Sequence, residues 1–377
     1  MKLCMSKADH GGKLFEAIGQ DLRDLSRLET IISADVLDAW FDPSPRVLEK
    51  LREHLPFLAR TSPPVHAGGL IAAISATRGI PTSNLCVGGG SSQLIFACLP
   101  DFTTKNGRTL LLDPTYSEYA HVLGAVLVRE VHRHTLHEEH GFRIESRAFL
   151  DHARRLHPEL IVIVNPNNPT GQYWPRAEIL EFVRRLPGTF CLVDETYIDY
   201  VAPGESLERE VDRYKNLVII KSMSKAYALS GMRVAYLAAS PDIIHYLGRR
   251  LPPWASGLAA QVAATEALHD PGYYRDRYRE THALRAETLE MLQGLPGVQL
   301  FDTCANFYLV KNTGQSAATM QRQLENEGIL VRHCDSMGLQ FHDDFLRVAV
   351  KTKEENARIA GALRSVVTGG VPCAARA

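Results

Sequence analysis

Two kinds of apolar segment alternate along the chain. Short runs of Val, Ile and Leu between turn residues predict strands that are buried on both faces, because such strands lack a polar side. Longer stretches with apolar residues at helical spacing predict helices. The predicted strands span residues 109–112, 160–164, 190–193, 217–220 and 234–238, and helices between them include 176–186 and 259–268. This alternation predicts an α/β fold around a mostly parallel sheet.

The two ends of the chain follow a different pattern. A Pro-rich connection at 42–45 leads into a predicted helix at 46–55. Beyond residue 270 we predict a charged helix at 274–292, strands around 299–310, 329–332 and 345–350, and a helix at 354–367. We therefore predict a large domain (46–260) and a smaller α+β domain (261–377) that the N-terminal segment (1–45) joins. Residues 369–377 are expected to be a frayed tail.

Composition and charge narrow the classes of function. The chain has 377 residues, 45% of them hydrophobic and 23% charged, with a formal net charge of -1. These values are typical of a globular protein and give no electrostatic reason to expect nucleic acid or a membrane as a partner. No apolar run approaches the ~18 residues that a membrane span needs. Seven cysteines without a CxxC pair indicate reduced thiols, so we expect a soluble cytoplasmic protein and no metal site.

Ligands of parallel sheets bind at the carboxyl ends of the strands, so polar clusters at those ends are the places to seek chemistry. Lys225 follows the predicted strand 217–220. Taken alone, it is equally well explained as a surface residue. However, Ser222 and Ser224 supply hydroxyl groups, and Arg233, eight residues further on, supplies a guanidinium group. These groups suit a phosphate dianion, while the Lys225 amine can form an imine with an aldehyde.

Two more polar segments follow predicted buried strands. Residues 165–171 read Asn-Pro-Asn-Asn-Pro-Thr-Gly, a rigid turn that presents the Asn168 amide at a strand end. Asp194 ends the strand at 190–193, and an acid in that position needs a cationic or protonated partner, such as a protonated pyridine nitrogen. Tyr197, three residues on, can donate to a phenolate oxygen.

A glycine-rich turn completes the set. Residues 88–92 read Gly-Gly-Gly-Ser-Ser and lead into a helix, and they do not match the GxGxxG dinucleotide motif. Such a turn leaves backbone N–H groups free at the positive end of the helix dipole, where a phosphate binds well. By itself the turn is weak evidence of a site. Beside the other segments, it predicts a phosphate cup.

The motifs NPNNPTG (165–171), DETY (194–197) and SMSKAYALSGMR (222–233) resemble those of fold-type I pyridoxal-5'-phosphate (PLP) enzymes of the class I/II aminotransferase family. Within this family the chain is most similar to histidinol-phosphate aminotransferases and threonine-phosphate decarboxylases, from about residue 42 to 367. The resemblance implies an aspartate-aminotransferase-like fold with a seven-stranded, mostly parallel sheet. It also implies PLP as the cofactor and a homodimer with the active site at the interface.

The same resemblance implies roles for individual residues. Lys225 would bind PLP covalently and move a proton between substrate and cofactor, and Asp194 would pair with the pyridinium nitrogen. Asn168 and Tyr197 would bond the ring O3', and Tyr116 would stack on the ring, with a core tyrosine as the alternative. The phosphate would be bound by Gly90, Ser91, Ser92, Ser222, Ser224 and Arg233. Arg347, with Asn168, would hold the substrate; Arg332 is a further residue expected near Arg347.

Two segments depart from histidinol-phosphate aminotransferases. Their Asn-Glu-Asn-Pro segment is replaced here by Leu-Asp-Ala-Trp-Phe-Asp at 37–42. Trp40 and Phe41 are interpreted either as core residues at an interface, which we favour, or as the lining of an altered pocket. The tyrosine that reaches the neighbouring subunit's phosphate is missing from residues 60–66, so either Thr61, Ser62 or His66 replaces it or the contact is lost. Histidinol phosphate is therefore not a firm expectation for the substrate.

The leading hypothesis is transamination between an L-amino acid or amino-alcohol phosphate and a 2-oxo acid. The alternatives are decarboxylation, as in threonine-phosphate decarboxylases, or cyclisation or elimination in a specialised biosynthetic pathway. A PLP-sensing transcription regulator would need a DNA-binding domain, and the first forty or so residues lack a basic helix-turn-helix pattern. An inactive scaffold is disfavoured because Lys225, Asp194 and Arg233 are all present.

Overall fold

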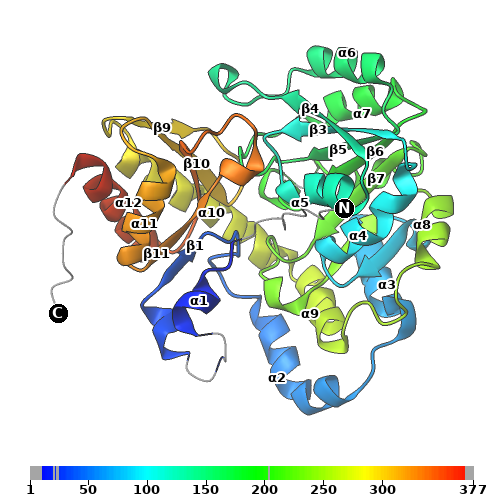
Figure 1. Ribbon diagram of the computed structural model, residues 1–377. Helices are drawn as coiled ribbons and strands as arrows, with labels where there is room; N and C mark the ends of the chain where they lie inside the picture. Colours follow the sequence, from blue (N-terminus) through cyan, green and yellow to red (C-terminus); the bar gives the residue numbers. More distant parts are fainter. Residues whose placement is uncertain (1–10, 20–21, 23–24, 203, 370–377) are drawn as a thin grey trace, which may run out of the picture.

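The computed structural model describes residues 11–19, 22, 25–202 and 204–369, and it contains two β-sheets surrounded by helices (Figure 1). The larger sheet has seven strands in the order β2-β8-β7-β6-β5-β3-β4. Neighbouring strands pair in parallel, except that β8 is antiparallel to both β2 and β7. The strands are β2 (Leu85–Gly88), β3 (Arg108–Asp113), β4 (Glu130–Thr135), β5 (Leu160–Val164), β6 (Phe190–Asp194), β7 (Leu217–Ser222) and β8 (Ala235–Ala238). The predicted α/β fold with a mostly parallel seven-stranded sheet is confirmed.

Helices cover both faces of this sheet, which explains the continuous apolar runs. In β5, Ile161 and Ile163 face one buried cluster, whereas Leu160, Val162 and Val164 face another. Helices α3, α6, α7 and α9 contribute to the first cluster, and α4 and α8 to the second. The helices of this part are α2 (Pro45–Arg60), α3 (Gly68–Arg78), α4 (Ser91–Phe102), α5 (Ser117–Ala120), α6 (Ser146–Leu156), α7 (Arg176–Arg184), α8 (Pro241–Gly248) and α9 (Leu258–Leu268).

The smaller sheet has five strands in the order β1-β11-β12-β10-β9. Its edge strand β1 pairs in parallel with β11, although the two lie about 300 residues apart in the chain, and Figure 1 shows the blue β1 beside the orange β11. The other pairs are antiparallel. The strands are β1 (Ile32–Ala34), β9 (Val298–Phe301), β10 (Phe307–Asn312), β11 (Ile329–His333) and β12 (Phe345–Ala349). The N-terminal segment thus supplies a strand to the C-terminal part, while the domain limits 1–45, 46–260 and 261–377 stay a prediction.

Helices α10 and α12 begin within three residues of their predicted starts, whereas α1 and α11 were not predicted. Helix α12 starts with a capping box in which Thr352 and Glu355 satisfy each other's backbone N–H groups. The helices are α1 (Leu14–Ile18), α10 (Pro271–Leu292), α11 (Ala317–Asn326) and α12 (Lys353–Thr368). Residues 370–377, most of the expected frayed tail, lie outside the described residues. Among the helices that are described, none is long and apolar enough to cross a membrane.

Candidate active site

The ends of β2, β3, β5, β6 and β7 meet at one cavity of about 260 Å³, which the segment after β1 and strand β12 also line. All of the predicted site residues line this cavity except Gly90, which lies directly beside Ser91. Those that line it are Ser91, Ser92, Tyr116, Asn168, Asp194, Tyr197, Ser222, Ser224, Lys225, Arg233 and Arg347. The topology therefore brings together residues that are spread over more than half of the sequence.

Asp194 is a buried acid at the end of β6. Its Oδ1 accepts hydrogen bonds from the backbone N–H (3.0 Å) and the hydroxyl (2.6 Å) of Thr196, and its Oδ2 accepts one from the hydroxyl of Tyr119 (2.8 Å). Burial raises the pKa of Asp194, and the bonds from Thr196 and Tyr119 oppose that rise. A carboxylate can accept about four hydrogen bonds, so Asp194 retains capacity for one more donor, such as a protonated ring nitrogen.

The turn before α4 and Arg233 form the cationic end of the cavity. Gly90 is the N-cap of α4 with a φ of 99°, and no side chain among the described residues caps the helix, so its first N–H groups are available to an anion. A Cβ atom on Gly90 would clash with Nη2 of Arg233, so only glycine lets the backbone approach this guanidinium group. Arg233 Nη1 also donates to Ser224 Oγ (3.3 Å). This donor set fits a phosphate group.

Glu118 is a buried acid at the same end that we did not predict. Its Oε2 accepts hydrogen bonds from the hydroxyls of Tyr116 (2.7 Å) and Ser92 (3.0 Å). The first bond fixes the orientation of the Tyr116 ring beside the cavity. The second uses the hydroxyl proton of Ser92, which leaves the backbone N–H of Ser92 as its donor toward the cavity. Ser222 differs, since its Oγ accepts from the backbone N–H of Ser224 (3.2 Å) and keeps its own proton free.

Arg347, on β12, is buried beside Asn168. Its Nη1 donates to Asn168 Oδ1 (2.7 Å) and its Nη2 to the carbonyl of Asp35 (2.8 Å), whereas its Nε has no hydrogen-bond partner among the described residues. Because the Asn168 oxygen is engaged, its NH₂ group remains as a donor. Burial lowers the pKa of Arg347, and the nearby Tyr197 hydroxyl opposes this shift. Burial also raises the pKa of Tyr197, which keeps this hydroxyl protonated as a donor.

The amine of Lys225 lies beside a second acid that we did not predict. Lys225 Nζ is 2.6 Å from Asp38 Oδ1 and 3.5 Å from Ser230 Oγ. Burial lowers the pKa of Lys225, and Asp38 acts in the opposite direction. A lysine with a lowered pKa has more neutral amine at a given pH and is a better nucleophile toward an aldehyde.

Trp40 and Phe41, in the same segment as Asp38, do not line the cavity. Trp40 Nε1 donates to Thr281 Oγ1 on α10 (2.8 Å), and Phe41 packs edge-to-face against Tyr273 and Tyr274. Phe41 is buried in the core and Trp40 is half-buried against it, so these contacts favour the core interpretation over the altered pocket. Their position at an interface stays a prediction.

Arg332 lies next to Arg347, because β11 and β12 pair these two residues directly. Its Nη2 donates to Ser336 Oγ (3.1 Å), and it is not among the residues that line the cavity. The expected proximity of the two arginines is thus present, while a role of Arg332 in binding stays a prediction.

A lysine amine, a buried acid and a glycine-capped helix meet at the strand ends of this fold, an arrangement that fits a PLP-dependent enzyme of fold type I. The chain belongs to the aminotransferase class I and II family, whose model matches residues 37–363. The donor set that the cavity presents fits PLP, which confirms the expected cofactor.

Relatives and solved structures agree with this assignment. A histidinol-phosphate aminotransferase from Desulfitobacterium hafniense (strain Y51) is 30% identical over 298 residues, which cover 78% of this chain and 81% of the relative. One from Methanococcus maripaludis is 27% identical and covers 86% of both chains. The Sinorhizobium meliloti histidinol-phosphate aminotransferase, solved with PLP, has a TM-score of 0.84 at 20% identity, covering 98% of this chain and 97% of that one. The Porphyromonas gingivalis L-threonine-O-3-phosphate decarboxylase has a TM-score of 0.79 at 23% identity, covering 90% and 100%.

Proposed function

We propose that this enzyme transfers the amino group of an L-amino acid or amino-alcohol phosphate to a 2-oxo acid. The observation that carries the proposal is the position of Arg347. Its buried guanidinium group lines the same cavity as Lys225, contacts Asn168 and has an Nε without a hydrogen-bond partner among the described residues. A guanidinium group in this place suits the carboxylate of an amino or oxo acid, and it would orient the substrate α-carbon toward the lysine.

The residues of the cavity take the following roles in this proposal. PLP supplies an electron sink for the bonds of the substrate α-carbon when it is bound. Asp194 would keep the proton on the ring nitrogen, and Asn168 and Tyr197 would donate to the ring oxygen O3'. Lys225 would hold the cofactor, and its amine would carry the proton to and from the substrate α-carbon. The phosphate is held by Ser222, Ser224, Arg233 and the N–H groups of Gly90, Ser91 and Ser92, while Tyr116 stacks on the ring.

The cofactor assignment is tested with Lys225→Ala. We expect the purified protein to show an absorbance band of lysine-bound PLP and the variant to lack it. Lys215→Ala, which removes an exposed lysine elsewhere on the surface, serves as the matched control and should keep the band. An unchanged spectrum in Lys225→Ala would overturn the proposal.

The reaction is tested by supplying a panel of amino acids and amino-alcohol phosphates with 2-oxo acids and analysing the products by mass spectrometry. We expect the amino group to appear on the oxo acid. Release of carbon dioxide would support a decarboxylase instead, and loss of water, ammonia or phosphate without amino transfer would support a cyclase or an eliminating enzyme.

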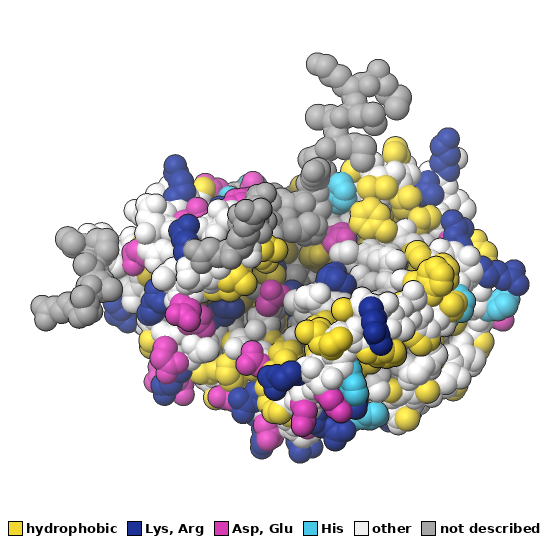
Figure 2. All heavy atoms as spheres, turned by 90° about the horizontal axis from the view of Figure 1, so that it is seen from below, with side chains coloured by type: hydrophobic (Ala, Val, Ile, Leu, Met, Phe, Trp, Pro, Cys, Tyr) yellow, Lys and Arg dark blue, Asp and Glu magenta, His cyan; other side chains and the backbone are white. Residues whose placement is uncertain are grey.

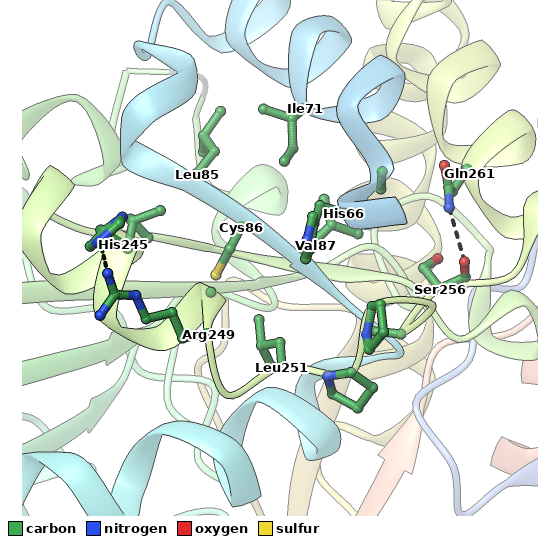
Figure 3. Close-up of a pocket in the computed structure, with 16 residues that line it drawn as sticks. His66, Ile71, Leu85, Cys86, Val87, His245, Arg249, Leu251, Ser256 and Gln261 are labelled. Carbon is green, nitrogen blue, oxygen red and sulfur yellow. Dashed lines mark hydrogen bonds between the residues drawn. The ribbon is translucent and has the colours of Figure 1, made fainter. Parts of the chain in front are cut away.

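We also propose that the protein is a homodimer, with a second copy covering a cavity of about 310 Å³ next to the phosphate turn. Figure 3 shows His66 on one wall and the His245–Arg249 pair on another. The loop 252–256, which lines this cavity, packs against the phosphate turn. The approach is so close that a Cβ atom on Gly89 would clash with the carbonyl of Ala255. The backbone N–H of His66 donates to the carbonyl of Pro253 in the same loop (3.1 Å).

Apolar side chains near this cavity support the dimer proposal. Trp254 is 61% exposed and Val65 is 48% exposed. Leu55 and Phe57 are exposed on α2, and apolar side chains are visible on that face of the molecule in Figure 2. In such a dimer we propose Thr61, Ser62 or His66 as the replacement for the missing tyrosine at the partner's phosphate, with loss of this contact as the alternative.

The dimer is tested by the variant Trp254→Glu, which places a charge on the exposed apolar surface. We expect light scattering after size exclusion to give twice the chain mass for the natural protein and a shift toward the single-chain mass for the variant. A natural protein that is fully active as a single chain would overturn the proposal.

We further propose a cytoplasmic location, which the unpaired cysteines support. Cys86, Cys98, Cys191, Cys304 and Cys334 are free. Seven reactive thiols are expected after denaturation without reductant, one for each cysteine of the chain. A lower number would show that disulfides form and would contradict a reducing compartment.

A further inference from the structure

Asp38 contacts the atom on which the proposed chemistry depends. Its Oδ1 lies 2.6 Å from Lys225 Nζ and 2.5 Å from Ser230 Oγ. Ser230 follows Lys225 by five residues, so the same loop presents the lysine and the hydroxyl that anchors the acid. A hydrogen bond between an ammonium group and a carboxylate at this distance is of the strong, charge-assisted kind.

The backbone around Asp38 is fixed on both sides. The carbonyl of Leu37 accepts from Asn306 Nδ2 (3.1 Å), and Trp40 Nε1 donates to Thr281 (2.8 Å). Two residues before Leu37, the carbonyl of Asp35 accepts from Arg347. The carboxylate of Asp38 is therefore held beside Lys225 by the fold, although half of its side chain (49%) is exposed.

Among the charged groups around this pair, Asp38 is the carboxylate that stabilises the protonated form of Lys225. No other carboxylate pairs with Nζ within the described part of the chain. The nearby cations are Arg347 and Arg233, which act on Lys225, and Lys351, which acts on Asp38; the Tyr197 hydroxyl also faces Asp38. Without Asp38, a protonated Lys225 would face two guanidinium groups, and like charges disfavour the protonated form.

We propose that Asp38 is a further catalytic residue, which binds the Nζ ammonium group of Lys225 whenever this lysine is not bonded to the cofactor. The inference rests on the proposed function, since it assumes that Lys225 is released from PLP during each reaction. The released amine accepts the proton that leaves the substrate α-carbon and thereby becomes an ammonium group. Asp38 and Ser230 hold that group beside the cavity, so they set how readily Lys225 gives its proton to the substrate or returns to the cofactor.

The inference is tested on the cofactor-free protein, so that its readout does not need activity. Lys225 is acylated with acetic anhydride over a range of pH, and peptide mass spectrometry gives the rate at this one residue. Only the neutral amine reacts. We expect Asp38→Asn to lower the pKa of Lys225 by about one unit or more, because a carboxylate at this distance shifts a pKa by about 1–3 units. The acylation rate near neutral pH should therefore rise roughly tenfold.

Two matched variants complete the test. Asp42→Asn removes an exposed carboxylate from the same segment and should leave the acylation profile of Lys225 unchanged. Asp38→Glu keeps the charge and should restore most of the natural profile. Thermal unfolding curves will show that each variant is folded. Equal profiles for the natural protein and Asp38→Asn would overturn the inference.

The outcome is separable from that of the proposed function. If Lys225→Ala retains the PLP band, then the proposed function fails, whatever Asp38 does. If Lys225→Ala loses the band while Asp38→Asn leaves the acylation profile unchanged, only the role of Asp38 fails. A second readout is the rate of PLP uptake by the cofactor-free protein, which should rise in Asp38→Asn because bond formation needs the neutral amine.

Discussion

The hydroxyl of Tyr119 donates a hydrogen bond of 2.8 Å to Asp194, and both side chains are buried. Burial drives the pKa of Asp194 up and would favour a neutral acid, so each donor that Asp194 keeps helps it to remain a carboxylate. Tyr119 thus acts on the group that is proposed to keep a proton on the cofactor ring, although it is not itself among the residues that line the cavity.

We expect Tyr119→Phe to lower kcat roughly tenfold, because a hydrogen bond to a charged group contributes about 1.5–3 kcal/mol and 1.4 kcal/mol corresponds to a factor of ten. Asp194 then competes better for the ring proton, which weakens the electron sink. Steady-state kinetics measure the effect. Tyr308→Phe is the control, because the buried Tyr308 hydroxyl has no hydrogen-bond partner within the described residues. Equal losses in the two variants would contradict this role of Tyr119.

The phosphate turn yields a second prediction. We expect Gly90→Ala to weaken PLP binding at least about tenfold, because the residue has a φ of 99° and its new Cβ atom would push against Arg233. Titration of the cofactor-free protein with PLP, followed by fluorescence, gives the Kd. Gly231→Ala is the matched control in the same region, since a Cβ atom there meets no atom within 4 Å. PLP affinity that survives Gly90→Ala would place the phosphate elsewhere.

A third prediction concerns Arg347. Arg347→Lys keeps the positive charge but loses the planar fork that binds a carboxylate at two points. We expect KM for the amino acid to rise roughly a hundredfold, since truncating a buried charged pair costs about 2–5 kcal/mol. The Kd for PLP should change little. Arg322→Lys, on the exposed face of α11, controls for the substitution itself. A parallel loss of PLP affinity would show that Arg347 serves the cofactor instead.

The fourth prediction is a dependence of stability on pH. His134 Nδ1 lies 3.2 Å from His152 Nδ1, and burial, with the neighbouring His152, lowers the pKa of His134 from 6.5 to about 4. The folded chain therefore binds fewer protons than the unfolded chain between pH 4 and 6.5, so stability from this group is present above pH 6.5 and is lost as the pH falls toward 4.

We expect His134→Phe to reduce the fall in melting temperature between pH 7.5 and 4.5 by about 2 °C, which corresponds to about 1 kcal/mol after allowance for the partial exposure of the ring. Melting curves at both pH values measure it. The exposed His269 supplies the control variant, His269→Gln. If the two variants have the same pH dependence as the natural protein, His134 does not titrate in this window.

The strands that are buried on both faces could be predicted from the sequence, because such strands consist of apolar residues throughout. Strand β5 spans the predicted residues 160–164, because both of its faces are covered and every residue is apolar. Strand β4 was not predicted, since this edge strand reads Glu-Val-His-Arg-His-Thr and is only half buried. The antiparallel direction of β8 could not be predicted either, because its four residues are as apolar as those of the parallel strands in the same sheet and carry no mark of direction.

The candidate site was predictable to the extent that its residues follow buried strands. Glu118 and Tyr119 were missed because both lie on the short helix α5, where spacing alone does not distinguish a site residue from a core residue. Tyr119 lies one helical turn after Tyr116, which is the only hint in the sequence. Asp38 lies in the segment 37–42, whose departure from the family pattern was recognised. Only its large aromatic residues, Trp40 and Phe41, were interpreted as candidates for a role. Only the three-dimensional contact with Lys225 distinguishes it.

The pairing of β1 with β11 affects the order in which the chain folds as well as the architecture of the folded protein. Strands β2 to β8 follow one another within residues 85–238, so the large sheet can form while the rest of the chain is still being synthesised. Strand β1 (Ile32–Ala34) can pair only after its partner residues in β11, Ile329–Val331, have been synthesised. Closing so long a loop is slow, because its entropy cost precedes any contact. The first strand of this protein therefore finds its partner among the last steps of folding, and it exposes an unpaired edge until then.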